Sequence, residues 1–366
     1  MSDDLDQRSA EELAYLRAVL AASTTAAELL GAMEDVAERL APERSALLAA
    51  RIAERFGGPL AAHATALQSA PAPTELASFD RIFAAGFQHA RECAALFGGF
   101  PDASPAERIP RILTALHHHA QAQEHFYVVR TLLPAFHDYW SPDRIADGAE
   151  ASPAAKRSAL VRVSAGGDHG GFAVYVPEEY DDSRPWPLIV ALHGGSGNGR
   201  DFLWTWVRDA KRAGYLLVAP TAVGSTWGEV DEIGLLEIVA WLRNRYRVDD
   251  GRILLTGLSD GGTFTLVYGL AHPEVFRALA PCCGVFHPVS FANGNLERAR
   301  DVPIYLVHGA QDFLFPVGLA HVTRDTLTAA GARLDYRELP ELSHTYPRSE
   351  NPAILDWFAR VATPRI

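Results

Sequence analysis

The amino-acid sequence predicts two regions of different fold class: an all-helical N-terminal domain, then an α/β domain with a mostly parallel central sheet. Three observations support this prediction. Residues 1 to about 140 are rich in Ala, Leu, Glu and Arg, which favour helices, and show no alternating apolar runs. Beyond residue 150, several short runs are apolar throughout, as strands buried on both faces require. Helical patterns separate these runs, and this alternation is typical of parallel sheets with helical crossovers.

In the N-terminal domain, two apolar stripes at helical spacing predict packed helices. Thr25 and Glu28 have the spacing of a capping box, which marks a helix N-terminus, and the first stripe follows them. It consists of Leu29, Met33, Val36 and Leu40. The second stripe consists of Phe83, Phe87, Ala90, Ala94 and Phe97. The glycines at 98–99 are expected to end that helix, and another is expected over residues 105 to about 139, kinked at its internal prolines. A helical bundle or array is therefore predicted.

A stretch of small and polar residues from Ser141 to Pro153 has the composition of a linker. It places the domain boundary near residue 150, giving a helical domain over 1–150 and an α/β domain over 151–366. The strands expected in the second domain are 160–163 and 172–176, as a hairpin, then 188–192, 215–219, 252–256, 278–281, 304–307 and 334–338. The helices expected between and after them are 201–213, 232–246, 262–271, 318–330 and 353–361.

Composition and charge narrow the class of protein. The chain has 366 residues, 48% of them hydrophobic and 21% charged, which is typical of a soluble globular protein long enough for two domains. Its net charge of -12 would repel nucleic acids and anionic lipid surfaces, so a small-molecule substrate is expected instead. The N-terminus lacks a basic segment before an apolar core, and no apolar run approaches bilayer length. No membrane span and a cytoplasmic location are therefore expected.

The strongest chemical signal is the run Gly257-Leu258-Ser259-Asp260-Gly261, which matches the G-x-S-x-G pattern. It stands directly after the apolar residues 253–255 and before a predicted helix. In such a sharp turn the hydroxyl of Ser259 is exposed at the edge of the sheet, and the positive end of the helix favours a developing oxyanion. Ser259 is therefore the candidate nucleophile, although glycine-flanked serines also occur in ordinary turns.

A glycine-rich loop, His193-Gly194-Gly195-Ser196-Gly197, follows the expected strand 188–192 and is the candidate oxyanion loop. Its donor would be the backbone N–H of Gly194 or of Gly195, joined by the N–H of Asp260. The alternatives are an ordinary glycine-rich connection and a phosphate-binding loop. The second alternative would need a lysine that this loop lacks.

The remaining two candidates are a carboxylate and an imidazole on loops after late strands. Asp312 follows the strand 304–307 and is the candidate triad acid, whereas the competing Asp325 and Asp335 do not lie on a loop just past a strand. His344 follows the final strand and is the candidate general base, since an imidazole can accept and return a proton near neutral pH. With 14 histidines in the chain, position rather than residue type selects His344.

The chain order Ser259, Asp312, His344 is that of α/β-hydrolases. Together with the runs HGGSGNG, GLSDGG, HGAQD and LSHTYP, it makes residues 155–366 resemble the α/β-hydrolase superfamily, and within it the carboxylesterase and phospholipase group of serine esterases. The resemblance does not extend to the N-terminal domain. It implies hydrolysis of carboxylic esters through an acyl-enzyme, without a metal or an organic cofactor.

Several aromatic residues could line the substrate pocket or belong to the core. Trp204, Trp227, Phe286 and Phe313 lie on segments expected to border the nucleophile, with Trp227 and Phe313 favoured because both are expected on active-site loops. The adjacent Cys282 and Cys283 are expected to be buried packing residues. The run His117-His118-His119 points around a helix rather than toward one ligand set, so no metal site is expected.

The sequence thus predicts a serine carboxylesterase that hydrolyses small or aromatic acyl esters. A serine peptidase or acyltransferase with the same triad is an alternative, and a non-catalytic hydrolase-like binding module is another. The helical N-terminal domain is expected to serve as a cap or as a contact in a homo-oligomer. The acyl chain and the alcohol depend on pocket shape rather than on these motifs.

Overall fold

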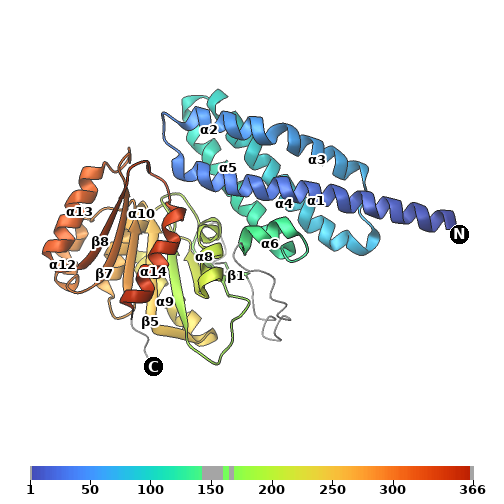
Figure 1. Cartoon of the computed structure of the whole chain (residues 1–366). Coiled ribbons are helices and arrows are strands. Elements are labelled where there is room, and N and C mark those ends of the chain that lie inside the picture. Colours follow the sequence, from blue (N-terminus) through green and yellow to red (C-terminus); the bar gives the residue numbers. More distant parts are fainter. Residues whose placement is uncertain (1, 142–159, 165–168, 363–366) are drawn as a thin grey trace. The chain divides into compact units, whose positions relative to one another are not determined.

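A computed structural model describes residues 2–141, 160–164 and 169–362 of the chain (Figure 1). The chain divides into two compact units, Met1–Ile145 and Ala146–Ile366, which we describe separately. The predicted boundary near residue 150 lies outside the described residues.

The N-terminal unit is helical throughout its described elements, as predicted, and its helices α4 and α5 pack side by side (Figure 1). Its α-helices are α1 (Ser2–Arg39), α2 (Ser45–Ile52), α3 (Gly58–Ser69), α4 (Ala77–Gly99), α5 (Pro105–Val129) and α6 (Pro134–Trp140). A π-helical turn, η1 (Ala53–Gly57), and two 3₁₀ turns, η2 (Thr74–Leu76) and η3 (Phe100–Asp102), join them.

The capping box predicted at Thr25 and Glu28 is wrong, because both residues lie inside α1. The apolar stripe continues toward the N-terminus past these positions: Tyr15, Val19, Ala22 and Ala26 are buried, as are Leu29 and Met33. Thr25 instead bonds to His63, and Glu28 pairs with Arg55. The capping box of this unit stands at Ser104 and Glu107, where α5 begins.

One helical segment, Ala10–Glu38 within α1, is long and apolar enough to cross a membrane by length and composition, contrary to the expectation that no run approaches this length. Of its most apolar stretch, 44% is buried, and core helices of soluble proteins meet the same criterion. The expected absence of a membrane span, the cytoplasmic location and the role of this unit as a cap or oligomer contact stay predictions.

The second unit contains an eight-stranded sheet in the order β1-β2-β4-β3-β5-β6-β7-β8. Its strands are β1 (Leu160–Val163), β2 (Phe172–Tyr175), β3 (Trp186–Leu192), β4 (Leu216–Pro220), β5 (Val248–Leu258), β6 (Ala278–Cys282), β7 (Pro303–Gly309) and β8 (Arg333–Leu339). The predicted hairpin forms, since β1 pairs antiparallel with β2, and β2 with β4; the other neighbours are parallel. Every residue of β3, β4, β6 and β7 is buried, which explains why these strands are apolar apart from His308 in β7.

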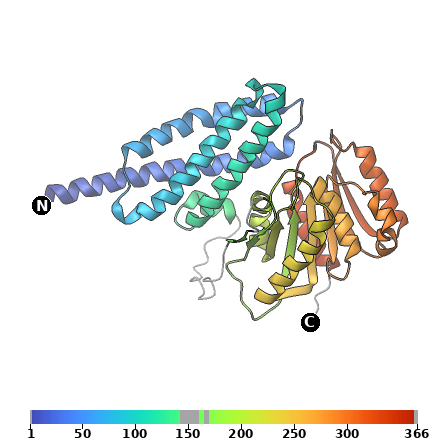
Figure 2. The same ribbon diagram turned by 180° about the vertical axis from the view of Figure 1, so that it is seen from behind.

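Helices cover both faces of this sheet. They are α7 (Gly199–Phe202), α8 (Val207–Ala213), α9 (Glu229–Arg245), α10 (Asp260–Ala271), α11 (Val289–Ala292), α12 (Asn295–Arg298), α13 (Val317–Ala329) and α14 (Asn351–Val361), with 3₁₀ turns η5 (Leu203–Thr205) and η6 (Arg348–Glu350). Helices α8 and α14 lie on one face and α9 and α10 on the other, as Figure 2 shows from behind. The α/β class predicted for this unit is confirmed.

The single helix predicted over 201–213 is instead broken into α7, η5 and α8. Five nearly consecutive side chains in this stretch are buried: Phe202, Leu203, Trp204, Trp206 and Val207. On one regular helix these positions would point around the whole circumference. The break allows all of them to reach the core.

Candidate active site

The nucleophile turn lies between β5, which ends at Leu258, and α10, which begins at Asp260. Ser259 has φ 56° and ψ -115°, a backbone conformation that non-glycine residues rarely adopt and that is typical of strained functional turns. Two backbone hydrogen bonds hold the turn: Ser259 N donates to Cys282 O at 2.9 Å, and Thr263 N donates to Ser259 O at 2.8 Å. The turn therefore presents Ser259 at the carboxyl end of the sheet, as predicted from G-x-S-x-G.

The glycines around Ser259 are required by close backbone contacts. A Cβ atom at Gly257 would lie 2.5 Å from the carbonyl carbon of Gly261. One at Gly261 would lie 2.4 Å from His193 O and 2.5 Å from Leu192 O. Because these are backbone atoms, no side-chain rearrangement can make room. The close packing of α10 against the end of β3 therefore requires glycine at both positions.

We therefore expect Gly261→Ala to destabilise the C-terminal unit by about 1–3 kcal/mol, or more, as overpacking does. The matched control is Gly234→Ala in α9, where an added Cβ meets no atom within 4 Å. That change is expected to stabilise the helix by about 0.5–1 kcal/mol. Urea denaturation of both variants measures the two effects. A Gly261→Ala variant as stable as Gly234→Ala would contradict the packing argument.

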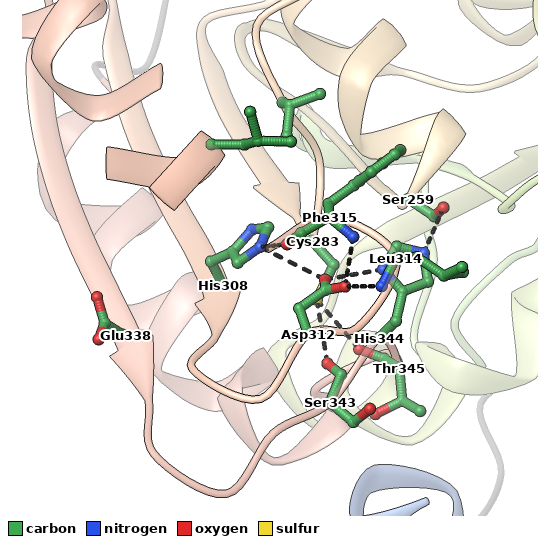
Figure 3. Close-up of polar contacts among 12 residues, drawn as sticks. Ser259, Cys283, His308, Asp312, Leu314, Phe315, Glu338, Ser343, His344 and Thr345 are labelled. Atoms are coloured by element: carbon green, nitrogen blue, oxygen red, sulfur yellow. Dashed lines mark hydrogen bonds and ion pairs between the residues drawn. The ribbon is translucent and has the colours of Figure 1, made fainter. Parts of the chain in front are cut away.

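The side chains of Ser259, His344 and Asp312 form one hydrogen-bonded chain (Figure 3). Nδ1 of His344 lies 2.8 Å from Oδ2 of Asp312, and Nε2 lies 2.7 Å from Oγ of Ser259. Because a carboxylate only accepts hydrogen bonds, Nδ1 carries the imidazole proton and Nε2 is free to accept from the serine hydroxyl. The structure thus brings together the three residues selected from the sequence.

The carboxylate of Asp312 is fully buried and held on both oxygens. Its Oδ1 accepts from the backbone N–H groups of Leu314 and Phe315, at 2.9 and 2.7 Å, while Oδ2 faces His344. The competing carboxylates have other partners: Asp325 pairs with Arg324 at the surface, and Asp335 accepts from the indole of Trp357. The geometry therefore favours Asp312 as the group that orients the imidazole.

The glycine-rich loop borders the nucleophile turn. A Cβ atom at Gly194 would lie 3.6 Å from Cβ of Ser259, and one at Gly195 would lie 4.0 Å from Cβ of Asp260. The carbonyl of Gly194 accepts from Nδ1 of His193 at 2.6 Å and from the N–H of Gly197 at 3.0 Å. In a trans peptide the next N–H points opposite to the carbonyl, so the N–H of Gly195 points away from these two donors.

A buried polar network fixes this loop. His193 accepts from the N–H of Ala222 on Nε2 at 3.0 Å, and burial lowers the pKa of its imidazole, so it is neutral. The indole of Trp227 lies 4.8 Å from the imidazole between ring centres, tilted by 38°, and donates to His193 O at 2.8 Å. The backbone N–H of Trp227 in turn donates to the carboxylate of Asp260, whose pKa is raised by burial. Trp227 thus links the candidate oxyanion loop to the nucleophile turn.

The four aromatic residues proposed as substrate contacts lie in different surroundings. Trp204 and Trp227 are buried, with 1% and 3% of their surface exposed. Phe313 is 52% exposed, and its ring centre lies 6.4 Å from that of His344. Phe286 is partly buried and packs edge-on against Phe291. Of the four, Phe313 therefore has the clearest access to a molecule bound beside His344.

Sequence reasoning did not select three side chains that surround Asp312 and His344: Cys283, His308 and Phe315 (Figure 3). The ring of Phe315 stands edge-on to that of His344, with centres 5.2 Å apart. The thiol of Cys283 lies 3.5 Å from Thr345 O and 3.8 Å from Ser343 O, on either side of His344. Burial raises its pKa to about 12, so it stays protonated. Only His308, inside the HGAQD run, carried a sequence signal.

Cys282 and the histidines of the run 117–119 were predicted to be packing residues or surface residues rather than parts of a site. Cys282 is a buried free thiol, as expected of a packing residue. His119 is buried and bonds to Leu30 O, whereas His118 bonds to His89. Among residues 2–141, 160–164 and 169–362, no group of three His, Cys, Asp or Glu side chains is arranged to hold a metal ion.

Parts of the chain are similar to known proteins. Residues 235–360 match the family model of phospholipases and carboxylesterases. A bifunctional acetylxylan esterase/xylanase of Neocallimastix patriciarum is 32% identical over 146 residues, covering 38% of this chain and 21% of that protein. A feruloyl esterase B of Talaromyces stipitatus is 30% identical over 161 residues, covering 39% and 44%. The chain thus spans less than half the length of either relative.

Among solved structures, an acetyl xylan esterase from Aspergillus awamori superposes with a TM-score of 0.44 at 17% identity, covering 55% of this chain and 99% of that one. The family match runs from α9 to α14, a range that includes Ser259, Asp312 and His344. Within the C-terminal unit, residues 235–360 are therefore similar to phospholipases and carboxylesterases, and the unit as a whole has an α/β fold.

Proposed function

We propose that this protein is a serine carboxylesterase, with Ser259 as nucleophile, His344 as general base and Asp312 as the acid that orients the imidazole. The observation that carries the proposal is the chain of two hydrogen bonds, 2.7 and 2.8 Å long, that joins these side chains at the carboxyl end of the sheet. Nucleophile, base and orienting group within hydrogen-bond reach are the signature of nucleophilic acyl transfer.

The reaction proceeds in two halves. His344 Nε2 takes the hydroxyl proton while Ser259 Oγ bonds to the ester carbonyl carbon, giving a tetrahedral intermediate. The C–O bond to the alcohol then breaks, and His344 returns the proton to the leaving alkoxide, which leaves an acyl-enzyme. Water repeats the sequence: His344 accepts its proton, the hydroxyl oxygen attacks the acyl carbon, and Ser259 regains a proton as the acid departs.

The negative charge of each intermediate falls on the former carbonyl oxygen, so donors must face that atom. We propose the backbone N–H groups of Gly195 and Asp260. Support comes from the Gly194 carbonyl, which is held on the side of His193 and therefore turns the N–H of Gly195 to the opposite side. Asp260 begins α10, where backbone N–H groups lack partners within the helix.

We also propose that the substrates are small or aromatic acyl esters. The two curated relatives are described as acetylxylan and feruloyl esterases, whose names refer to an acetyl and an aromatic acyl group. In this chain, Phe313 and Phe315 place rings 6.4 and 5.2 Å from the ring of His344. Apolar rings at this distance suit an aromatic or short aliphatic group better than a charged one.

A panel of p-nitrophenyl esters of graded chain length, together with methyl esters of hydroxycinnamic acids, tests this function. We expect kcat/KM to be highest for acetyl, butyryl or hydroxycinnamoyl esters and at least about tenfold lower for dodecanoyl esters. Each additional methylene group changes the binding free energy only a little, but the changes add up over a long acyl chain. p-Nitroanilides and added methanol serve as competing tests. Faster cleavage of the amides, or net acyl transfer to methanol, would replace the esterase by a peptidase or an acyltransferase. If no substrate were turned over, the result would favour a non-catalytic binding module instead of an enzyme.

A further inference from the structure

A second histidine lies beside Asp312 and has no part in the mechanism above. His308 is near the end of β7, and its side chain is fully buried. Its Nε2 lies 2.8 Å from the carbonyl oxygen of Phe315 and 3.4 Å from Oδ2 of Asp312 (Figure 3). Since a carbonyl oxygen only accepts hydrogen bonds, Nε2 carries a proton and donates it to Phe315, with the carboxylate of Asp312 close by.

Whether the imidazole of His308 is charged depends on its other ring nitrogen, Nδ1. Nδ1 is buried and has no hydrogen-bond partner among the described residues. A proton there would be both buried and unpaired, so His308 is a neutral imidazole with its single proton on Nε2. Burial also lowers the pKa of His308, which agrees with this assignment. An apolar side chain would leave no unpaired nitrogen, so packing alone does not account for a histidine here.

The contacts of His308 reach both catalytic partners of Ser259. Phe315, whose carbonyl accepts from His308, donates its N–H to Oδ1 of Asp312 at 2.7 Å. The ring of Phe315 also stands edge-on to the imidazole of His344. One proton on His308 therefore fixes the short segment 312–315, and that segment fixes the carboxylate on one side and the imidazole on the other.

We propose that His308 is a positioning residue, which holds Asp312 and Phe315 in the orientation that keeps His344 aligned with Ser259. It contacts neither substrate nor the reacting atoms. The proposal rests on the proposed function, because alignment of His344 matters only if this histidine transfers protons. Loss of the Nε2–H donor is expected to let the 312–315 segment shift and to misalign the imidazole, which slows the chemical step. Because Phe313 and Phe315 lie on the same segment, substrate binding is expected to weaken as well, by a smaller factor.

Three substitutions separate positioning from packing. In His308→Gln the amide nitrogen comes near the place of Nε2 and can still donate to Phe315 O. In His308→Asn the shorter side chain places its amide nitrogen near the position of Nδ1, where it cannot reach Phe315 O. His308→Leu has no hydrogen-bond donor at all. We expect Asn and Leu to lower kcat by between about tenfold and a hundredfold, with a smaller rise in KM. Gln is expected to recover most of the activity.

The control is His119→Leu in α5, which also removes a buried, hydrogen-bonded imidazole but lies in the N-terminal unit. It is expected to lower stability and leave kcat per folded molecule unchanged. If His308→Leu does not fold, the Gln and Asn variants carry the comparison. Wild-type kcat in the Asn variant, or equal loss in Gln and Asn, would overturn the proposal.

A substrate-free readout separates this proposal from the proposed function. The proton between His344 Nδ1 and Asp312 should give a far-downfield resonance in the proton NMR spectrum. We expect that resonance to persist in His308→Gln and to broaden or shift upfield in His308→Asn. A wild-type protein that hydrolyses no ester would overturn the proposed function, whereas this NMR difference would still support the positioning role. An unchanged resonance in all variants would overturn it.

Discussion

Ser259→Ala is expected to abolish ester hydrolysis, lowering kcat by at least about 10⁴-fold, while the protein stays folded. The substitution removes a single oxygen atom whose recorded side-chain partner is Nε2 of His344. The turn itself depends on the backbone bonds to Cys282 and Thr263, which alanine retains. Hydrolysis of p-nitrophenyl acetate measures the loss, and a thermal melt followed by circular dichroism shows whether folding is preserved.

The matched control is Ser343→Ala, which removes the same atom from a buried serine one residue away from His344. The hydroxyl of Ser343 has no hydrogen-bond partner among the described residues, so its loss should leave kcat near the wild-type value. A fluorophosphonate probe should label the wild type and the control but not the Ser259 variant. Full activity after Ser259→Ala would remove this residue from the nucleophile role, whatever the control shows.

The positions of Ser259, Asp312 and His344 could be predicted because each depends on a local pattern. A buried strand followed by a short loop leads to the carboxyl edge of a parallel sheet, and three such loops meet there. The glycines of the nucleophile turn follow from the same packing, since a Cβ at Gly261 would overlap His193 O. The order of these elements along the chain therefore predicted the α/β class and placed the three candidate residues at one edge of the sheet.

Features that depend on contacts between distant segments could not be predicted this way. The start of α1 was misplaced because a threonine and a glutamate at capping spacing are also compatible with a continuous helix once Tyr15 and Val19 extend its buried face. Trp227 is buried where its indole reaches His193 O, a contact between residues 34 positions apart in the chain. The role of His308 depends on how segment 312–315 folds back, which spacing does not encode.

Asp312→Asn is expected to lower kcat by about 10⁴-fold, as the loss of the orienting carboxylate does in related triads. The hydrogen bonds around Asp312 explain this expected loss of activity. Its Oδ1 accepts two backbone N–H groups, from Leu314 and Phe315, so the oxygen of an asparagine must occupy that place. The amide NH₂ would then face Nδ1 of His344, which could only accept. The imidazole proton would move to Nε2, which could no longer take the proton of Ser259.

Because the asparagine keeps both bonds to the 312–315 segment, the variant should fold and bind substrate with nearly unchanged KM. Steady-state kinetics on p-nitrophenyl acetate measures kcat and KM separately. The matched control is Asp325→Asn, in which a surface carboxylate paired with Arg324 undergoes the same change and should leave kcat near the wild-type value. If Asp325→Asn lost activity and Asp312→Asn did not, the acid assignment would be wrong, and the 2.8 Å bond between Asp312 and His344 would have no catalytic meaning.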